Sequence, residues 1–549
     1  MPGAAFRNII RDNGASATSG RGRHEEHIRR RASGPPMDRW DIGDPRVQFH
    51  PELQGVSSAP RPAAAGLEAT VLPSRPVMFR LLPLPRHAWF VLAASALLSL
   101  AIALAFPLLD PDEGRNAEVA REMAVTADVV IPHLAQMPYL DKPPALFAAG
   151  ALFVKLMGPT PLAVRLPAML ASLLTLFLLA QVALRIASAQ FAWRVILLTA
   201  GAPLFAMLSA YVIFDMLLAA CVTLVWTMLA LEVERGPSSQ RRLLMFAAVA
   251  LGVLVKGPVM LMWAIGGSAA AAACSRSTRP LAWLAWWPGW LVVFAIAGGW
   301  FAAALRRHPE YAHYAFLEES LERMTSKSFQ RDQPVWFVPA VLLGGALPWS
   351  LLTPWRWPMR PSSRVAAGFV LFAAVFFSLS HSKLVTYLLP AIPALAWWAA
   401  EGWTARPRGR VALVATVLFM PVLLVAGFPW LYRAATKTSG APLAQAIAAI
   451  GAKAVRYEDC YSPGTDFLLG TPSSVVSALG HPITSNYVVR YRTKLRERGQ
   501  WRLFETPETA PKADVIVREL RRGRTDPPPG FVPFHEDARF IAFRRQPLR

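Results

Sequence analysis

Long apolar blocks with few charges inside them constrain this 549-residue chain more than any other feature. The first block, from His87 to Pro107, carries no Asp, Glu, Lys or Arg and is long enough to cross a hydrocarbon core of roughly 30 Å as a helix. No small-residue cleavage site follows it, which favours a spanning helix over a cleaved signal peptide. Since 54% of the residues are hydrophobic and only 17% are charged, the sequence predicts an all-α polytopic membrane protein.

The length of each apolar block predicts about 11 to 13 membrane-spanning helices. The expected spans lie near residues 87–107, 166–184, 194–210, 213–232, 243–257, 259–274, 281–304, 336–352, 365–380, 385–401 and 411–432. A shorter apolar block at 143–157 carries Lys155 and is expected to form a juxtamembrane helix at the surface.

Arginine-rich connections between the blocks indicate the orientation of the chain. With a cytoplasmic N-terminus, the positive-inside rule is satisfied at every cytoplasmic turn. These turns hold Arg185 and Arg194; Arg235, Arg241 and Arg242; Arg276 and Arg279; Arg356, Arg360 and Arg364; and Arg406, Arg408 and Arg410. The same parity places 108–142, 211–215, 305–335, 381–383 and the C-terminal tail outside. We therefore expect a multi-pass protein of the bacterial inner membrane with these segments in the periplasm, so that an active site built from them would face the periplasm.

Composition divides the chain into three parts. Residues 1–77 are rich in Arg, Gly, Ser, Pro and Ala and are expected to be a disordered arm, although translation starting at Met78 is an alternative reading. Residues 78–435 form the expected membrane domain, and 436–549 a small extracytoplasmic α/β domain with strands near 514–517 and 539–543. The net charge of +22 is explained by cytoplasmic loops and membrane lipid, so we expect no nucleic-acid partner.

Two short segments of the first outer loop carry charges in constrained backbone. Asp112 and Glu113 follow Pro111, where a helix can begin and where negative charge is favourable. Asp141 and Lys142 precede two prolines that fix the local backbone. The first segment is either part of an active site or a helix start with solvated ion pairs. The second either holds a phosphate or anchors a helix end in lipid headgroups.

Further polar side chains are expected on the same face of the membrane. Asp215 lies between two apolar blocks, where a carboxylate faces a partner or a wet cavity, or else caps the next helix. Lys383 and Tyr387 are four residues apart and are expected on one helical face, either at a site or as an interfacial anchor. Lys256 cannot be separated from an anchoring role by sequence alone.

Taken together, these segments resemble the GT-C glycosyltransferases of the family that contains the lipid A aminoarabinose transferases and, more remotely, the protein O-mannosyltransferases. The resemblance covers about residues 80–430 in consistent order. It is carried by Asp112-Glu113-x-Arg115 with Ala117-Glu118 and Arg121-Glu122-Met123, Tyr139-x-Asp141-Lys142-Pro143-Pro144, Arg165-Leu166-Pro167, Asp215, Lys256-Gly257-Pro258, and Ser382-Lys383-x-x-x-Tyr387-x-x-Pro390.

This resemblance implies the GT-C fold and a sugar donor on a polyprenyl phosphate. The sugar would be a pentose such as aminoarabinose, or a hexose, and the acceptor lipid A, lipopolysaccharide or another envelope lipid or glycan. Carried over residue by residue, Asp112 is the implied catalytic carboxylate, with Glu113 and Asp215 organising its surroundings. The implied ligands of the donor phosphate are Arg115, Tyr139, Lys142, Lys383 and Tyr387.

The sequence departs from the family pattern at positions that bear on which sugar, which acceptor and which metal, if any, the protein binds. Asn116 stands where a tyrosine is usual and Asp141 where a glutamate is usual, and 329–334 lacks the histidine often found there. No cofactor is implied with certainty; a divalent metal is left open, with Asp141 as its only candidate ligand.

Two alternatives to this function remain at the level of sequence. One is an enzyme like the protein O-mannosyltransferases. The other is a non-catalytic polyprenyl-lipid transporter or binding protein, which should place its polar residues near the middle of the bilayer, often in repeated halves. The polar residues of this chain are expected at one membrane face and no repeat is visible, which favours the enzyme.

Overall fold

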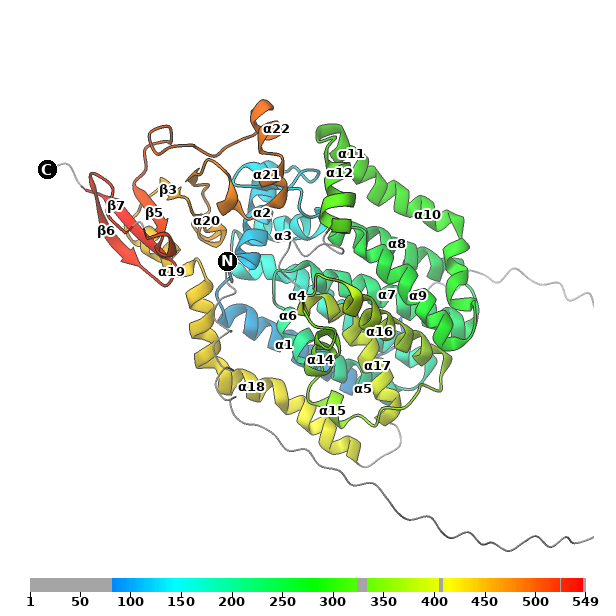
Figure 1. Cartoon of the computed structure of the whole chain (residues 1–549). Helices are drawn as coiled ribbons and strands as arrows, with labels where there is room; N and C mark the ends of the chain where they lie inside the picture. Colours follow the sequence, from blue (N-terminus) through cyan, green and yellow to red (C-terminus); the bar gives the residue numbers. More distant parts are fainter. Residues whose placement is uncertain (1–80, 323–332, 404–407, 524, 547–549) are drawn as a thin grey trace, which may run out of the picture. The chain divides into compact units, whose positions relative to one another are not determined.

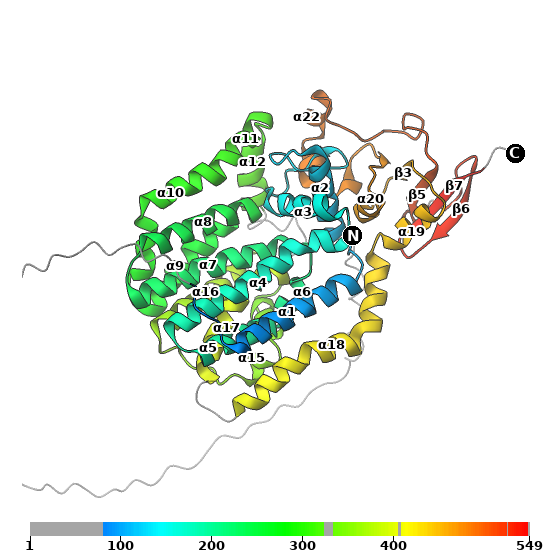
Figure 2. The same cartoon turned by 180° about the vertical axis from the view of Figure 1, so that it is seen from behind.

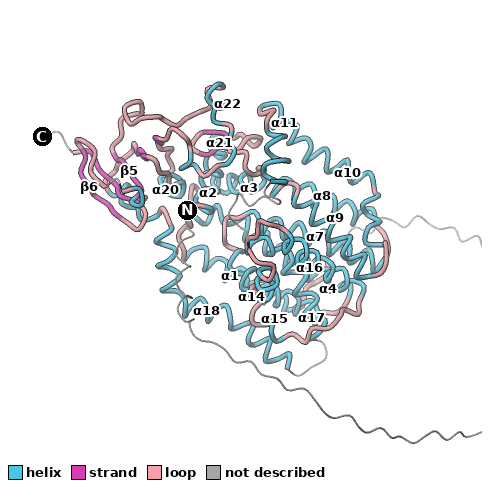
Figure 3. Tube along the Cα trace, viewed as in Figure 1, coloured by secondary structure: helices cyan, strands magenta, loops and turns pink. Residues whose placement is uncertain are grey.

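The structure is a computed structural model that describes residues 81–322, 333–403, 408–523 and 525–546. The predicted arm, residues 1–77, and the alternative start at Met78 lie outside the described residues. The described chain is mostly helical, and its larger sheet belongs to the C-terminal tail (Figures 1 and 3).

Among the described residues, six helices are long and apolar enough to cross a membrane. Their bounds are Arg86–Ala105 (α1), Pro161–Ile186 (α4), Phe214–Arg235 (α7), Trp287–Arg307 (α10, η2 and α11), Pro361–Leu379 (α16) and Leu413–Thr438 within α18 (Arg408–Thr438). The other helices of the membrane domain are α5 (Ala189–Ala200), α8 (Ser239–Lys256), α9 (Val259–Ser275) and α17 (Ile392–Gly402). Helices therefore occur at all the predicted positions, and the chain is a multi-pass membrane protein.

Four of the predicted spans are interrupted rather than continuous. The span expected at 281–304 begins with a 3₁₀ turn, η1 (Arg279–Ala285), before α10. The span expected at 194–210 is divided between α5 and α6 (Pro203–Leu208), and that at 336–352 between α14 (Phe337–Gly344) and α15 (Trp349–Leu352). The span expected at 385–401 begins with a 3₁₀ turn, η4 (Val385–Ala391), before α17. A proline lies at or directly beside each interruption, and it lacks the N–H that a continuing helix would need.

Helix α7 forms the centre of the membrane domain. It packs against α4, α8, α16 and η4, and its most apolar 18-residue window is 83% buried. The corresponding windows of α1 and α18 are only 33% and 11% buried, so both helices expose apolar side chains such as Leu97 and Val425. An apolar surface of this kind is suited to contact with lipid.

The first loop, between α1 and α4, folds into a compact layer at one end of the helices. It contains α2 (Asp112–Thr126), a two-stranded hairpin of β1 (His133–Leu134) and β2 (Met137–Pro138), and α3 (Ala145–Met157). Helix α3 occupies the block expected to form a juxtamembrane helix, and it packs on α2 and α4.

The C-terminal tail forms a five-stranded sheet, and one short helix of the tail, α20, packs on α2, as Figures 1 and 2 show from opposite sides. The strand order is β4 (Ser474–Val476), β3 (Val455–Glu458), β5 (Val515–Glu519), β7 (Phe540–Arg545) and β6 (Phe531–Glu536). Strands β4, β3 and β5 are parallel, whereas β7 and β6 pair antiparallel. The predicted strands near 514–517 and 539–543 are confirmed as β5 and β7. Short helices connect them: α19 (Ala441–Ala449), α20 (Pro463–Leu469), η6 (His481–Ile483), α21 (Asn486–Arg490), α22 (Arg492–Glu497) and η7 (Leu520–Arg522).

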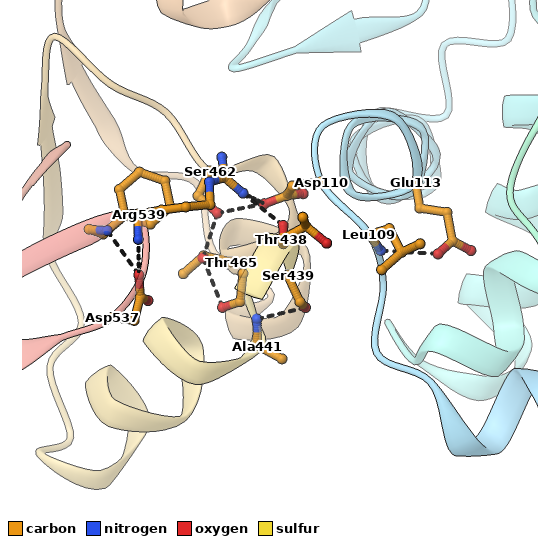
Figure 4. Close-up of polar contacts among 12 residues, drawn as sticks. Leu109, Asp110, Glu113, Thr438, Ser439, Ala441, Ser462, Thr465, Asp537 and Arg539 are labelled. Atoms are coloured by element: carbon orange, nitrogen blue, oxygen red, sulfur yellow. Dashed lines mark hydrogen bonds and ion pairs between the residues drawn. The ribbon is translucent and has the colours of Figure 1, made fainter. Parts of the chain in front are cut away.

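Asp110 ties this tail to the start of the first loop (Figure 4). Its buried Oδ2 accepts hydrogen bonds from Ser462 Oγ at 2.9 Å and from Arg539 Nη1 at 3.3 Å. Its backbone N–H donates to the carbonyl of Thr438 at the end of α18, at 3.2 Å. The approach requires glycine at Gly464, because a Cβ there would lie 2.6 Å from Asp110 Oδ1. A single aspartate thus joins three segments that are far apart in sequence.

A second contact between tail and loop buries several carboxylates around one guanidinium. Arg121 of α2 donates to both oxygens of Glu118, at 2.7 and 2.5 Å. Glu122 accepts the backbone N–H of Gln136 at 3.0 Å. From α20, Asp466 adds a third buried carboxylate and influences the pKa of Glu118, Arg121 and Glu122. Since one arginine faces three acids, the protonation of this contact affects the packing of α20 on α2.

The N-terminus of α2 is held by a buried ion pair between Glu113 and Arg165. The guanidinium donates to both carboxylate oxygens, at 2.8 and 2.7 Å, and also to the last carbonyls of the α1 segment at Ala103 and Phe106. Glu113 in turn accepts the backbone N–H of Val212, at 3.1 Å. The pair therefore fixes the ends of α1, α2 and α4 and the turn before α7 relative to one another.

We expect Arg165→Met to destabilise the protein by about 3–5 kcal/mol, because it leaves the Glu113 carboxylate buried without its cation. Thermal unfolding of the purified protein in detergent measures this as a lowered Tm. The double variant Glu113→Leu, Arg165→Met should recover only part of the loss, since the carbonyls that Arg165 serves stay unpaired. An unchanged Tm in the single variant would contradict the structural role of the pair.

The acid cluster predicts that docking of the tail weakens as the pH rises. Burial raises the pKa of both Glu122 and Asp466 to about 7, so the folded protein holds protons that the unfolded chain releases near pH 4. The contribution of these acids to stability is therefore complete below about pH 4 and is lost as the pH rises to about 7. The Tm in detergent should fall across this window, and Asp466→Asn, which stays neutral, should reduce the slope. An equal slope in wild type and variant would show that Asp466 does not titrate there.

Candidate functional site

A cavity of about 650 Å³ lies between the first loop, the C-terminal tail and the ends of the membrane helices. Its apolar wall includes Leu218, Met262, Trp263, Phe376 and Phe377. Its polar wall holds most of the residues that the sequence singled out: Asp112, Arg115, Asn116, Tyr139, Asp141, Lys142, Asp215, Lys256 and Tyr387. Segments more than two hundred residues apart thus meet around one space.

The first turn of α2 places Asp112 and Arg115 on the cavity wall. Arg115 Nη2 donates to Asp112 Oδ1 at 2.6 Å, and the Asp112 side chain is 56% exposed. Burial alone would lower the pKa of Arg115, but Tyr139 and the neighbouring carboxylates outweigh it and raise the pKa. Arg115 therefore stays a cation, and Asp112 is an accessible carboxylate beside it.

The proline-bounded segment places Asp141 and Lys142 side by side at the cavity. Asp141 Oδ1 accepts hydrogen bonds from the hydroxyl of Tyr314 and, at 3.0 Å, from the backbone N–H of Tyr487. Lys142 Nζ donates to the Asp141 carbonyl at 2.7 Å. Nearby, the buried ring of Tyr139 packs edge-on against Phe147. The orientation of Lys142 is thus set by the backbone of Asp141, which two other segments hold in place.

Asp215 is paired with Lys256, a partner that the sequence did not assign. Lys256 Nζ lies 2.5 Å from Asp215 Oδ1 and 4.6 Å from the centroid of the Tyr387 ring. All three residues line the cavity, at the start of α7, the end of α8 and within η4. Lys256 therefore belongs to the candidate site. Its sequence signals were its position at an apolar helix end and its place in the Lys256-Gly257-Pro258 segment of the family resemblance.

Two residues assigned to the site by resemblance have other surroundings in the structure. Glu113 does not line the cavity but is buried against Arg165. Lys383 does not line it either; its Nζ donates to the Gln333 carbonyl at 2.7 Å. The expectation that Lys383 and Tyr387 share a helical face is wrong, because residues 382–384 are not helical and the turn begins at Val385.

The tail supplies a wall of the cavity that sequence reasoning missed. His481, Thr484, Ser485, Asn486, Val489 and Arg490 all line it, and Arg115 Nη1 lies 3.4 Å from both oxygens of Thr484. Arg490 forms an ion pair with Glu318 of η3 (Tyr314–Glu322) at 2.8 Å. The soluble composition of the tail carries no motif, so no sequence signal could have placed these residues.

A second ion pair holds the tail against the end of the α11 segment. Arg498 donates to both oxygens of Glu310, at 2.9 and 3.0 Å, and the Tyr487 hydroxyl donates to Oε1 at 2.6 Å. Partial burial would raise the pKa of Glu310, but the hydrogen bonds from Tyr487 and Arg498 lower it to about 2. Glu310 is thus ionised over the physiological range and keeps Tyr487 positioned near Asp141.

The residues around Asp141 do not fit a divalent metal well. Within the part of the chain that the structure describes, no group of three His, Cys, Asp or Glu residues could hold a metal ion. One oxygen of Asp141 is already occupied by two hydrogen-bond donors. Asp141 therefore serves the protein contact first, and a single further oxygen is too few for a metal site.

Comparison with known proteins identifies related sequences. Residues 141–300 match the family described as dolichyl-phosphate-mannose-protein mannosyltransferase. Two relatives, each named undecaprenyl phosphate-alpha-4-amino-4-deoxy-L-arabinose arabinosyl transferase, come from Shewanella sediminis and Aeromonas salmonicida. The first is 28% identical over 58% of this chain and 61% of its own length. The second is 30% identical over 53% of this chain and 55% of its own length. The match thus spans less than two thirds of either relative.

Solved structures show the same fold over nearly the whole described chain. The crystal structure of ArnT from Cupriavidus metallidurans bound to undecaprenyl phosphate aligns with a TM-score of 0.68 and 22% identity, covering 84% of this chain and 98% of that one. Its apo structure gives a TM-score of 0.67 at 21% identity, covering 83% of this chain and 97% of that one. The chain therefore has the GT-C fold of ArnT and resembles the lipid A aminoarabinose transferases.

Proposed function

We propose that this protein is a membrane glycosyltransferase that transfers a sugar from a polyprenyl phosphate to an acceptor in the cell envelope. The observation that carries the proposal is the cavity itself, which joins an accessible carboxylate, Asp112, to the cations Arg115, Lys142 and Lys256 and to an apolar wall. A polyprenyl phosphate presents the complementary features, an anionic head and an apolar tail. The relatives named as arabinosyl transferases and the fold shared with ArnT support the same function.

We infer a part of the reaction for each group from its place in the cavity. In transfer, the bond between the anomeric carbon and the phosphate oxygen breaks, and the anomeric carbon bonds to an acceptor oxygen. Negative charge grows on the leaving phosphate, where Lys142 and Arg115 stabilise it. Lys256, paired with Asp215, adds a third cation at the same cavity. Tyr139 and Tyr387 add aromatic rings to the polar wall of the cavity.

Asp112 has a role that depends on the acceptor. A hydroxyl acceptor loses its proton as the new bond forms, and Asp112 is the exposed carboxylate that would take it. A phosphate of lipid A or lipopolysaccharide is already an anion and needs no base. With such an acceptor, Asp112 would orient Arg115 through their 2.6 Å ion pair.

Polar residues clustered at one end of the helices favour an enzyme over a transporter. Asp112, Lys142 and Asp215 come together there, whereas a transporter is expected to place its polar groups near the middle of the membrane. The proposed organisation is a membrane domain at 78–435 and a periplasmic domain at 436–549 that closes the site. The arginine-rich turns between the helices support a periplasmic site in the bacterial inner membrane.

The orientation is tested by reporter fusions in cells. A reporter fused after Arg410 should be cytoplasmic, and one fused after Lys437 periplasmic, because a single span connects these positions. Alkaline phosphatase activity checks the periplasmic fusion and fluorescence of a fused green protein the cytoplasmic one. A cytoplasmic signal after Lys437 would reverse the proposed side of the active site.

Variants of Asp112 and Lys142 test the proposed roles. Lys142→Ala should weaken binding of undecaprenyl phosphate and also lower turnover, since its contact with phosphate exists before the reaction and strengthens during it. Asp112→Asn should lower turnover by about a hundredfold or more with a hydroxyl acceptor, yet leave lipid-phosphate binding nearly unchanged. Transfer of labelled sugar in membranes and binding by the purified protein measure the two effects. Near-normal transfer to a hydroxyl acceptor by folded Asp112→Asn would rule out Asp112 as the base.

A further inference from the structure

Three neighbouring residues of the cavity wall carry buried polar atoms that have no hydrogen-bond partner among the described residues. These atoms are Arg115 Nε, Asn116 Oδ1 and Asp141 Oδ2. Asn116 and Asp141 are only 2% and 8% exposed, and both line the cavity. Buried polar groups are nearly always paired in folded proteins, so three exceptions on one wall indicate a site for a polar ligand.

The rest of each side chain is fixed by the protein. Asn116 Nδ2 donates to the Val212 carbonyl at 2.8 Å, which leaves Oδ1 on the other side of the amide. The other oxygen of Asp141 is held by Tyr314 and Tyr487. Arg115 uses its terminal nitrogens for Asp112 and Thr484. None of the three can turn to a new partner without losing an existing bond, so the arrangement is preorganised for a ligand.

The chemistry of the three atoms selects the kind of ligand. Two are acceptors, and they require a ligand that donates hydrogen bonds. A phosphate offers only acceptors, so it would be repelled by Asp141 Oδ2 and would not pair with Asn116 Oδ1. The hydroxyls of a sugar ring both donate and accept, and an amino substituent donates, so a sugar satisfies all three atoms.

The position of these three atoms in the cavity also agrees with a sugar ligand. Arg115 is bonded to Asp112, the proposed catalytic carboxylate, and Asp141 immediately precedes Lys142, the proposed phosphate ligand. The transferred sugar must lie between the group that faces the acceptor and the group that holds the phosphate. We propose that Asn116, Asp141 and the Nε of Arg115 form the subsite that binds the sugar ring of the donor, an assignment that rests on the proposed glycosyltransferase function.

Paired binding measurements test the subsite in the full-length purified protein. The probes are undecaprenyl phosphate and undecaprenyl phosphate carrying either 4-amino-4-deoxy-L-arabinose or a neutral hexose, whichever donor the wild type turns over. Asp141→Asn replaces the accepting Oδ2 by a donating amide, and Asn116→Ala removes Oδ1. Each should weaken binding of the sugar-bearing donor by about tenfold or more, the loss expected for a hydrogen bond in a dry site. The affinity for sugar-free undecaprenyl phosphate should stay within about twofold.

Tyr314→Phe is the matched control, because it removes a donor from the same carboxylate without altering Oδ2. It should leave the ratio of the two affinities unchanged, even where it lowers stability. An unchanged ratio in Asp141→Asn and Asn116→Ala, or an equal loss for both probes, would overturn the sugar subsite. Loss of Zn²⁺ binding in Asp141→Asn, together with wild-type sugar discrimination that disappears in EDTA, would overturn it in favour of a metal. A wild type that binds neither probe would instead refute the proposed function.

Discussion

The ion pair between Glu113 and Arg165 is the constraint on which the architecture of the site depends. Two charges buried in a membrane protein are stable only when each is fully hydrogen-bonded, and here the demand is met by backbone groups at the ends of several helices. These bonds hold the first turn of α2 in one position relative to α1, α4 and α7. This fixed turn places Asp112 and Arg115, which lie on either side of Glu113 in sequence, on the wall of the cavity.

The ion pairs between the tail and the loops differ in their exposure from the charged side chains along the cavity. Two of the contacts between the tail and the loops pair one acid with one base: Asp110 with Arg539, and Glu310 with Arg498. Along the cavity, the pairs are instead partly exposed or shared with an aromatic ring, as for Lys256 above Tyr387. Strong pairing is thus used for assembly, and accessible charge is kept for binding.

Much of the fold could be predicted because hydrophobic blocks and arginine-rich turns are local signals that the bilayer imposes. Other local features pointed to Asp112, Lys142 and Asp215: a helix start, a proline-bounded segment and a carboxylate between two apolar blocks. The family resemblance implied their roles. The ion pair of Asp215 with Lys256, the role of Glu113 and the surroundings of Lys383 could not be predicted, because they depend on which helix ends meet. The wall around Asn486 was missed for a related reason: its residues act through their position in the fold and form no pattern in the chain.

The contact of Arg115 with Thr484 spans 369 positions of sequence. After the helix that carries Arg115 has been synthesised, every later span must still be made and inserted. The tail must also reach the same side of the membrane before this wall of the cavity can form. A partly synthesised chain would therefore expose the charged turn of α2 without an enclosed pocket around it. The cavity can therefore form only when every span has the correct orientation. A single misplaced span would leave the two walls of the cavity on opposite sides of the bilayer.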